Sequence, residues 1–151
     1  MSQNHARQYV WSLMMYTFKT TLLAALLIPT FAGISAASAK NLRDEPTIDG
    51  PMLKVAIAIE ISDKCSSIEA RKLKGLNYLW GLKTAAKDLG YSDAEIKAYV
   101  ESSAEKSRIR ALGEAYVRAK GLNPTSDVDL CTLGTQEIAA NTLTGSLLRE
   151  R

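Results

Sequence analysis

The chain has 151 residues, a formal net charge of +3 at neutral pH, and a composition that is 46% hydrophobic and 23% charged. This length and composition predict one globular domain with a modest core. The small net charge gives little support to nucleic acid or an anionic membrane as a partner.

The first expected element is a secretory signal peptide over residues 1–39. No charged residue occurs between Lys19 and Lys40; a dense apolar run lies between them, and small residues lead up to Ala39. A positive flank, a short hydrophobic segment and an A-x-A cleavage site are typical of such signals, so we expect cleavage between Ala39 and Lys40. The alternative is an uncleaved inner-membrane anchor through residues 20–39, because this stretch reaches the roughly 20 residues that a spanning helix needs.

Cleavage of the signal peptide on export would determine which residues the mature chain contains. A compact signal would start at Met14 or Met15, and we predict that the true start lies at one of them. Cleavage removes the only histidine, His5, and leaves 17 Lys and Arg against 16 Asp and Glu. Without histidine, Ser-His-Asp and Cys-His nucleophilic catalysis, imidazole general-base catalysis and nearly all zinc sites are excluded.

Two cysteines, Cys65 and Cys131, follow the signal. In an exported protein an even pair indicates a disulfide, whereas two buried free thiols are the alternative. Closing a loop of this length would add roughly 4 kcal/mol to the free energy of unfolding on the chain-entropy model. A redox-active pair is not expected, because the chain has no C-x-x-C motif.

Residues 40–51 are polar and contain Pro46 and Gly50, so we expect a flexible lead-in. Residues 52–64 are ambiguous between strand and helix, because apolar residues alternate there and also recur at every fourth position. A lone strand cannot satisfy its backbone hydrogen bonds, and no turn signal pairs this segment with a second strand. We therefore expect a helix.

Ser66 and Glu69 have the spacing of a capping box, which predicts a second helix from there to about Leu89. Its leucines and Trp80 are expected to form a broad apolar face. The segment LGYSDAEI, residues 89–96, is the strongest local signal in the chain. Its glycine suits the left-handed residue after a helix, and its serine and second acidic residue form another capping box, so a very short turn is expected between two helices.

A third helix is expected over residues 93–120. Its middle, residues 101–110, is polar almost all round, which is typical of a helix that projects past the core or faces a partner. A fourth helix begins near Ser126 or Asp127. The predicted fold is therefore a small all-α, four-helix bundle-like domain over residues 52–151, with one disulfide and a preceding signal peptide.

Several segments in this order resemble a domain-of-unknown-function family of small exported alphaproteobacterial proteins: LRDEPTIDG, ARKLKGLNYLWGLK, LGYSDAEIKAYV, EKSRIRALGEAYV and DLCTLGTQEIA. The resemblance covers Leu42 to about Leu148 and implies a secreted helical domain with paired cysteines and no catalytic residues. Members are sometimes labelled as a subunit of NADH dehydrogenase. A [2Fe–2S] subunit needs four cysteine or histidine ligands, which this chain lacks, so cluster ligation is excluded and only an accessory or assembly role is conceivable.

The acidic residues of the third helix, Glu101, Glu105 and Glu114, are candidates for acid–base chemistry. Charged residues on a helix are far more often a solvated face, and no cleft is evident. Asp127 and Asp129 have too few oxygen neighbours for a calcium loop, so an N-terminal cap is the better interpretation. We expect no catalytic residue, no cofactor, no metal site and no enzyme activity.

Basic residues on the second and third helices are candidates for a strip that contacts an acidic partner or lipid headgroups. Acidic neighbours dilute this strip, and a role in solubility is favoured. Trp80 is the hot-spot candidate if one aromatic residue is exposed, and the candidate partner surface is Trp80, Arg108 and Arg110. The expected function is a non-enzymatic periplasmic or secreted binding or accessory protein with an unidentified protein partner. The alternatives are a membrane-anchored accessory or assembly factor of a respiratory complex and an exported enzyme that uses carboxylates.

Overall fold

A computed structural model describes residues 41–151, so the predicted signal peptide, its start and its cleavage site lie outside the described residues. The described part is mostly helical, as predicted, and the disulfide between Cys65 and Cys131 is present with an S–S distance of 2.04 Å. No helix among these residues has the length and hydropathy needed to cross a bilayer. The elements in chain order are η1 (Leu42–Asp44), α2 (Pro46–Lys64), β1 (Ile68–Ala70), α3 (Lys72–Asp88), α4 (Asp93–Glu101), α5 (Ser103–Ala119), α6 (Asp127–Ala139), α7 (Leu143–Ser146) and β2 (Leu148–Glu150).

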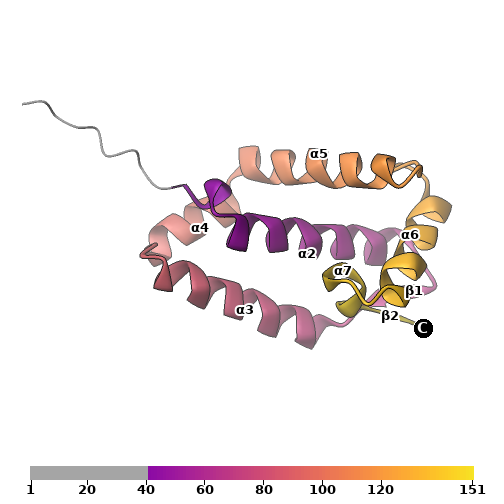
Figure 1. The fold of residues 1–151 in the computed structure, drawn as a ribbon, viewed down its shortest axis with the longest axis horizontal. Coiled ribbons are helices and arrows are strands. Elements are labelled where there is room, and N and C mark those ends of the chain that lie inside the picture. Colours follow the sequence, from indigo (N-terminus) through magenta and orange to yellow (C-terminus); the bar gives the residue numbers. More distant parts are fainter. Residues whose placement is uncertain (1–40) are drawn as a thin grey trace, which may run out of the picture. The chain divides into compact units, whose positions relative to one another are not determined.

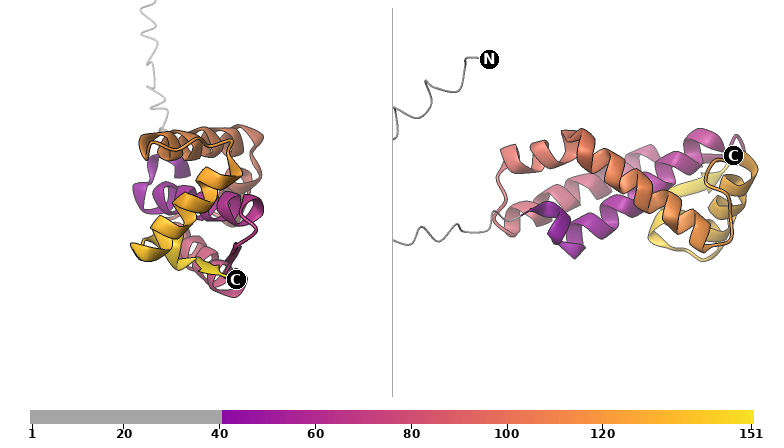
Figure 2. Two further views of the ribbon diagram at one scale, coloured as in Figure 1. Left: turned by 90° about the vertical axis from the view of Figure 1, so that its right-hand side faces the viewer. Right: turned by 90° about the horizontal axis from the view of Figure 1, so that it is seen from above.

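Helix α2 is the central element. It lies between α5 and α3, and α6 and α7 pack across its C-terminal half (Figures 1 and 2). Ile61 of α2 and Leu133 of α6 are fully buried where these helices meet, and the disulfide joins the end of α2 to α6 beside them. A second, smaller cluster of buried residues joins η1 and the start of α2 to the end of α3 and to α4.

The folded domain begins earlier than predicted. Asn41 caps η1 by accepting a hydrogen bond from the Arg43 backbone N–H, and Leu42 is buried. Helix α2 then starts at Pro46, not near Pro51. Proline is favourable in the first turn of a helix, where its missing N–H has no intrahelical partner. Residues 41–51, predicted as a flexible lead-in, therefore form one short helix and the beginning of α2.

Two short strands replace predicted helix ends. The predicted capping box at Ser66 does not form, because residues 68–70 pair with residues 148–150 as an antiparallel two-stranded sheet. Ile68 and Leu148 are buried in the core by this pairing, which holds together segments about 80 residues apart. The predicted fourth helix corresponds to α6, which ends at Ala139. The chain then turns through Asn141, which has a positive φ of 48°.

The third predicted helix is interrupted once. Helix α4 ends at Glu101, and Ser102 leaves the helical conformation with its side chain accepting from the Glu105 backbone N–H. Two helices, α4 and α5, therefore meet at an angle where one was expected. The capping box of Ser92 and Glu95, the left-handed Gly90 and the helix over residues 52–64 are present as predicted.

Candidate functional site

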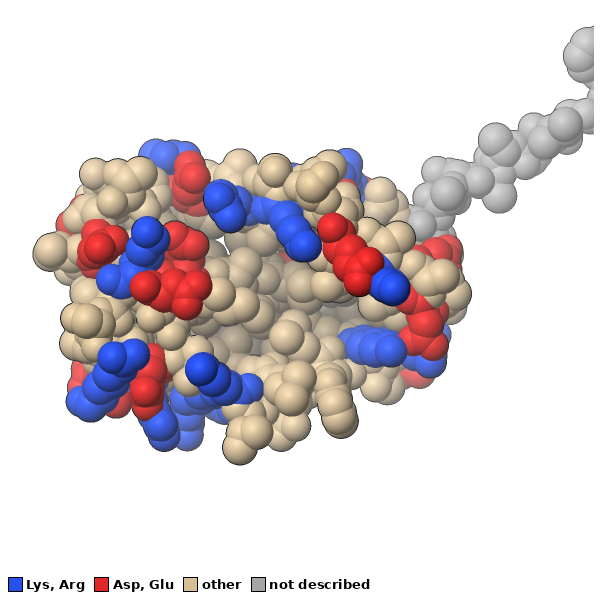
Figure 3. Space-filling model, turned by 180° about the vertical axis from the view of Figure 1, so that it is seen from behind, with Lys and Arg blue, Asp and Glu red and all other residues tan. Residues whose placement is uncertain are grey.

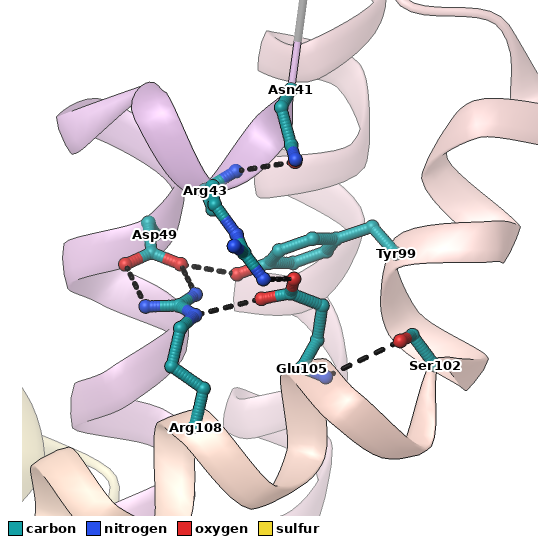
Figure 4. Close-up of polar contacts among 7 residues, drawn as sticks. All are labelled: Asn41, Arg43, Asp49, Tyr99, Ser102, Glu105 and Arg108. Atoms are coloured by element: carbon teal, nitrogen blue, oxygen red, sulfur yellow. Dashed lines mark hydrogen bonds and ion pairs between the residues drawn. The ribbon is translucent and has the colours of Figure 1, made fainter.

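A cluster of ion pairs links the start of α2 to α4 and α5 (Figure 4). Arg108 of α5 lies between two carboxylates: its Nη1 is 3.1 Å from Asp49 Oδ2 and its Nε is 2.7 Å from Glu105 Oε2. Its Nη2 donates to Asp49 as well, so the Asp49 contact is bidentate. Arg43 of η1 donates to the other oxygen of Glu105, and the Tyr99 hydroxyl donates to Asp49 Oδ1 at 2.5 Å. We call these five residues the polar cluster.

The electrostatics of the polar cluster keep its charges fixed. Burial alone would raise the pKa of Asp49, but hydrogen bonds from Arg108 and Tyr99 and the Arg108 charge outweigh it, so this pKa is lowered. The hydrogen bond from Arg108, opposed by burial and reinforced by Arg43, lowers the pKa of Glu105. Burial and the bond to Asp49 raise the pKa of Tyr99. Both carboxylates are therefore ionised and the tyrosine is neutral near pH 7.

This arrangement suits a structural link better than acid–base catalysis. A carboxylic acid that donates a proton near neutral pH needs a raised pKa, and both carboxylates of the polar cluster are shifted the opposite way. Two arginines balance two carboxylates, and each charged group has a partner of opposite charge. The candidate acid Glu105 is thus committed to ion pairs, while Glu101 and Glu114 form surface pairs with Lys97 and Arg118.

A cavity of about 260 Å³ adjoins the polar cluster. Its lining is polar and aromatic, but the side chains that could act on a ligand already have partners. Glu95 is bonded to Ser92, and the Tyr91 hydroxyl donates to Glu45 Oε1 at 3.0 Å. In the part of the chain that the structure describes, no buried side-chain polar atom lacks a hydrogen-bond partner, and no group of three acidic, cysteine or histidine residues is placed to hold a metal. The lining residues are Asn41, Leu42, Tyr91, Glu95, Ala98, Tyr99, Ser102 and Glu105.

The second candidate site is an exposed side of α3. Leu73, Leu76 and Trp80 recur at helical spacing, and their exposed fractions are 80%, 47% and 66%. The opposite side of the helix is the one that packs inward, through partly buried Leu79 and buried Ala86. The broad apolar face predicted for this helix is therefore only half covered. We call Leu73, Leu76 and Trp80 the α3 face.

Positive charge that is unpaired within the described residues lies at the N-terminal end of the α3 face. Arg71, Lys72 and Lys74, at the start of the helix, form no ion pair with any residue in 41–151. No acidic residue lies in the first turn of α3, and no side chain caps it. The space-filling view from behind shows uncharged side chains lining a hollow between α5 and α3, with both basic and acidic side chains around it (Figure 3).

The structure does not bring the predicted partner surface together. Trp80 is exposed on α3, as a hot-spot residue requires, but Arg108 is partly buried and is held by ion pairs in the polar cluster on α5. Arg110 is exposed on α5, a different helix from the one that carries Trp80. Sequence reasoning missed Asp49, because it lies in the segment predicted as a lead-in. It placed Leu73 and Leu76 on one broad apolar face with the covered leucines, since spacing alone does not show which side of an apolar helix is covered.

The predicted cap at the start of α6 is present. Ser126 accepts a hydrogen bond from the Asp129 backbone N–H, and the Asp129 carboxylate accepts from the Asn123 N–H at 2.8 Å. Asp127 lies in the first turn, where the helix dipole favours a negative charge.

These features describe a small disulfide-bonded helical domain whose polar cluster is closed and which leaves an apolar helix face open. The chain belongs to DUF5333, a family of unknown function, whose model matches residues 40–149. No curated protein and no solved structure was found to match it.

Proposed function

We propose that this protein is a non-enzymatic binding protein of an oxidising compartment, and that the α3 face is its contact surface. The observation that carries the proposal is the exposure of Leu73, Leu76 and Trp80 on one side of an ordered helix. Single exposed apolar residues are common, whereas a row of large apolar residues rimmed by charge is typical of an interaction site.

The chemistry of the α3 face supports this use. Tryptophan is enriched among the residues that dominate binding energy, because its ring buries a large area at low entropic cost. Burying a leucine that was exposed contributes about 1.5–3 kcal/mol. Covering these three side chains is therefore worth several kcal/mol of gross interaction energy to any complex that forms there.

The disulfide supports the proposed location in an oxidising compartment. Disulfides persist outside the reducing cytosol, in the periplasm or in secreted proteins, and Cys65 and Cys131 are bonded here. The predicted signal peptide would deliver the chain to such a compartment.

The absence of an enzymatic role is supported by the polar cluster. Its ionisable groups have pKa values shifted away from those that proton transfer near neutral pH requires. The side chains of the cluster are committed to one another, so binding at the α3 face is the function that the geometry favours.

Photocrosslinking tests this proposal. The crosslinking residue p-benzoylphenylalanine replaces Leu76 in one variant and Val128 of α6, a similarly exposed apolar residue, in a matched control. Irradiation in the cells that produce the protein should give a discrete protein or lipid adduct from position 76 and not from position 128, as read by mass spectrometry. The same adducts at both positions, or none at position 76, would overturn the proposal.

A further inference from the structure

We infer that the α3 face binds the surface of an anionic lipid bilayer. The inference rests on the proposed function and names its partner. It is carried by two independent properties of the same helix, which are a row of protruding apolar side chains and a concentration of positive charge.

The charge of the chain is unevenly distributed. Residues 71–87 contain five Lys and Arg and no Asp or Glu. Residues 40–151 contain 17 Lys and Arg against 16 Asp and Glu, so the rest of this segment holds 12 against 16, a net charge of −4. A molecule that is nearly neutral overall therefore has an excess of positive charge on and just before α3. The part of this charge that is unpaired in the described chain, Arg71, Lys72 and Lys74, lies at the N-terminal end of the helix that carries the α3 face. Clusters of basic residues beside apolar side chains are attracted to anionic headgroups.

Acidic neighbours cancel this charge at the C-terminal end of α3, where Asp88 lies and Asp93 pairs with two lysines, but not at the N-terminal end. Glu69, just before α3, already pairs with Arg149 at 2.6 Å and with Arg151 at 3.6 Å. Asp93, beyond the far end of the helix, pairs with both Lys83 and Lys87. The three cations at the start of α3 remain without an ion-pair partner in the described chain, and the positive end of the helix dipole adds to their field.

The apolar side chains have the geometry of an interfacial helix. Leu73, Leu76 and Trp80 protrude from one side of a 17-residue helix, so the helix can lie flat with this side in the headgroup region. Tryptophan is favoured at that depth, because its ring is apolar and its N–H remains able to find a polar partner. Apolar side chains at this spacing can also enter the groove of a partner protein, so it is the positive charge beside them, unpaired within residues 41–151, that favours an anionic bilayer.

Trp80 fluorescence is the direct test. In the full-length chain with Trp11→Phe, Trp80 is the sole tryptophan, so its emission reports the α3 face and no other membrane contact. Vesicles of phosphatidylcholine and phosphatidylglycerol in equal parts should shift the emission to shorter wavelength, and lipids brominated in the acyl chain should quench it. Pure phosphatidylcholine should give a much smaller effect. Raising the salt from about 0.1 M to about 1 M, which shortens the Debye length from about 10 Å to about 3 Å, should weaken the shift.

Charge-reversal variants test whether vesicle binding depends on α3 or on cations elsewhere on the surface. Lys72→Glu with Lys74→Glu should weaken binding to the anionic vesicles by about tenfold or more, since each basic residue near such a surface contributes about fivefold. Carboxylates are favourable in the first turn of a helix, so this variant should fold. The matched control is Lys106→Glu with Arg110→Glu on α5, two exposed cations without ion pairs in the described chain, and it should bind within about twofold of the parent.

The outcomes distinguish the inference from the proposed function. An unchanged Trp80 spectrum with anionic vesicles, or equal loss of binding in the two charge-reversed variants, overturns the lipid inference. If position 76 nevertheless crosslinks to a protein, the binding function stands and its partner is a protein. If neither vesicles nor crosslinking engages the α3 face, both are overturned.

Discussion

Gly145 lies where α7 meets the C-terminal end of α6, and its lack of a side chain permits that contact. A Cβ atom built there would lie 1.9 Å from the carbonyl oxygen of Glu137, which is a backbone atom and cannot rotate away. Gly134 of α6 is also enclosed, but its neighbours are the side chains of Ile68 and Ile61, at 2.6 and 2.7 Å from the added atom. Gly81 of α3 has no atom within 4 Å of such a Cβ.

These three glycines predict graded stability effects. Gly145→Ala should lower the free energy of unfolding by about 3 kcal/mol or more, because helices must move apart. Gly134→Ala should cost about 1–3 kcal/mol, since side-chain ends can adjust. Gly81→Ala should be neutral or stabilise by up to about 1 kcal/mol, as expected in a helix interior. Chemical denaturation measures all three.

The predicted order of the three stabilities can be tested even if one variant does not fold. Equal stability of the Gly145→Ala and Gly81→Ala proteins would show that α7 does not pack on α6 as described. If Gly145→Ala fails to fold, the difference between Gly134→Ala and Gly81→Ala carries the same test at a neighbouring contact.

The polar cluster acts at the scale of elements, because it ties η1 and α2 to α4 and α5. Asp49 and Arg108 are 59 residues apart, and Arg43 and Glu105 are 62 apart. Buried Tyr99 and Leu42 lie in the apolar cluster at the same end of the domain. The ion pairs therefore join elements that are distant in sequence, and they add to the apolar packing at this end of the domain.

This linkage predicts a dependence of stability on pH. The pKa values of Asp49 and Glu105 are lower in the folded protein than in the unfolded chain, so the folded state binds fewer protons in acid. Their contribution is fully present above about pH 4.5 and is lost as the pH falls through the folded pKa values. Asp49→Asn with Glu105→Gln should remove about 1–3 kcal/mol at pH 7, and the variant should lose less further stability between about pH 5 and pH 3 than the parent.

Denaturation curves at a series of pH values check this prediction. Glu114→Gln serves as the control, because Glu114 forms only an exposed pair with Arg118 and its removal should change stability by about 0.5 kcal/mol or less. Asp93 and Glu95 also have lowered pKa values, so some acid sensitivity should remain in the double variant. A slope equal to that of the parent between pH 5 and pH 3 would contradict the role assigned to the cluster.

Across the domain as a whole, the disulfide limits the freedom of the unfolded chain. Cys65 at the end of α2 and Cys131 in α6 are 66 residues apart, so the bond encloses α3, α4 and α5 in one loop. A domain of this size has a typical free energy of unfolding of about 5–15 kcal/mol. The roughly 4 kcal/mol expected from the disulfide is therefore a large share of the free energy of unfolding.

Replacing both cysteines by alanine should lower the free energy of unfolding by about 2–4 kcal/mol. Intact mass after alkylation provides the companion measurement: native protein should take up no alkyl group without reductant and two after reduction in denaturant. The same mass reports whether the chain begins at Lys40. Alkylation of both thiols in the native protein without reductant would contradict the disulfide and, with it, the proposed compartment.

Several features could be predicted from the sequence because their signals act within a few residues. The capping box of Ser92 and Glu95, the left-handed Gly90 and the helix over residues 52–64 follow from local hydrogen bonding and backbone sterics. The cysteine pair indicated the disulfide because a signal peptide was expected before it. The helix signals were sufficient for the fold class, and the family resemblance rested on the order of five short segments.

Which distant segments these local elements contact is decided by tertiary packing alone. Ser66 and Glu69 have the same spacing as Ser92 and Glu95, yet residues 68–70 form a strand because residues 148–150 lie beside them. Likewise, the apolar periodicity of α3 is the same on its covered and open sides, and the packing of the neighbouring helices alone leaves Trp80 exposed. Local propensities differ by at most about 1 kcal/mol per residue for most residue types, so burial and strand pairing at a distance outweigh them.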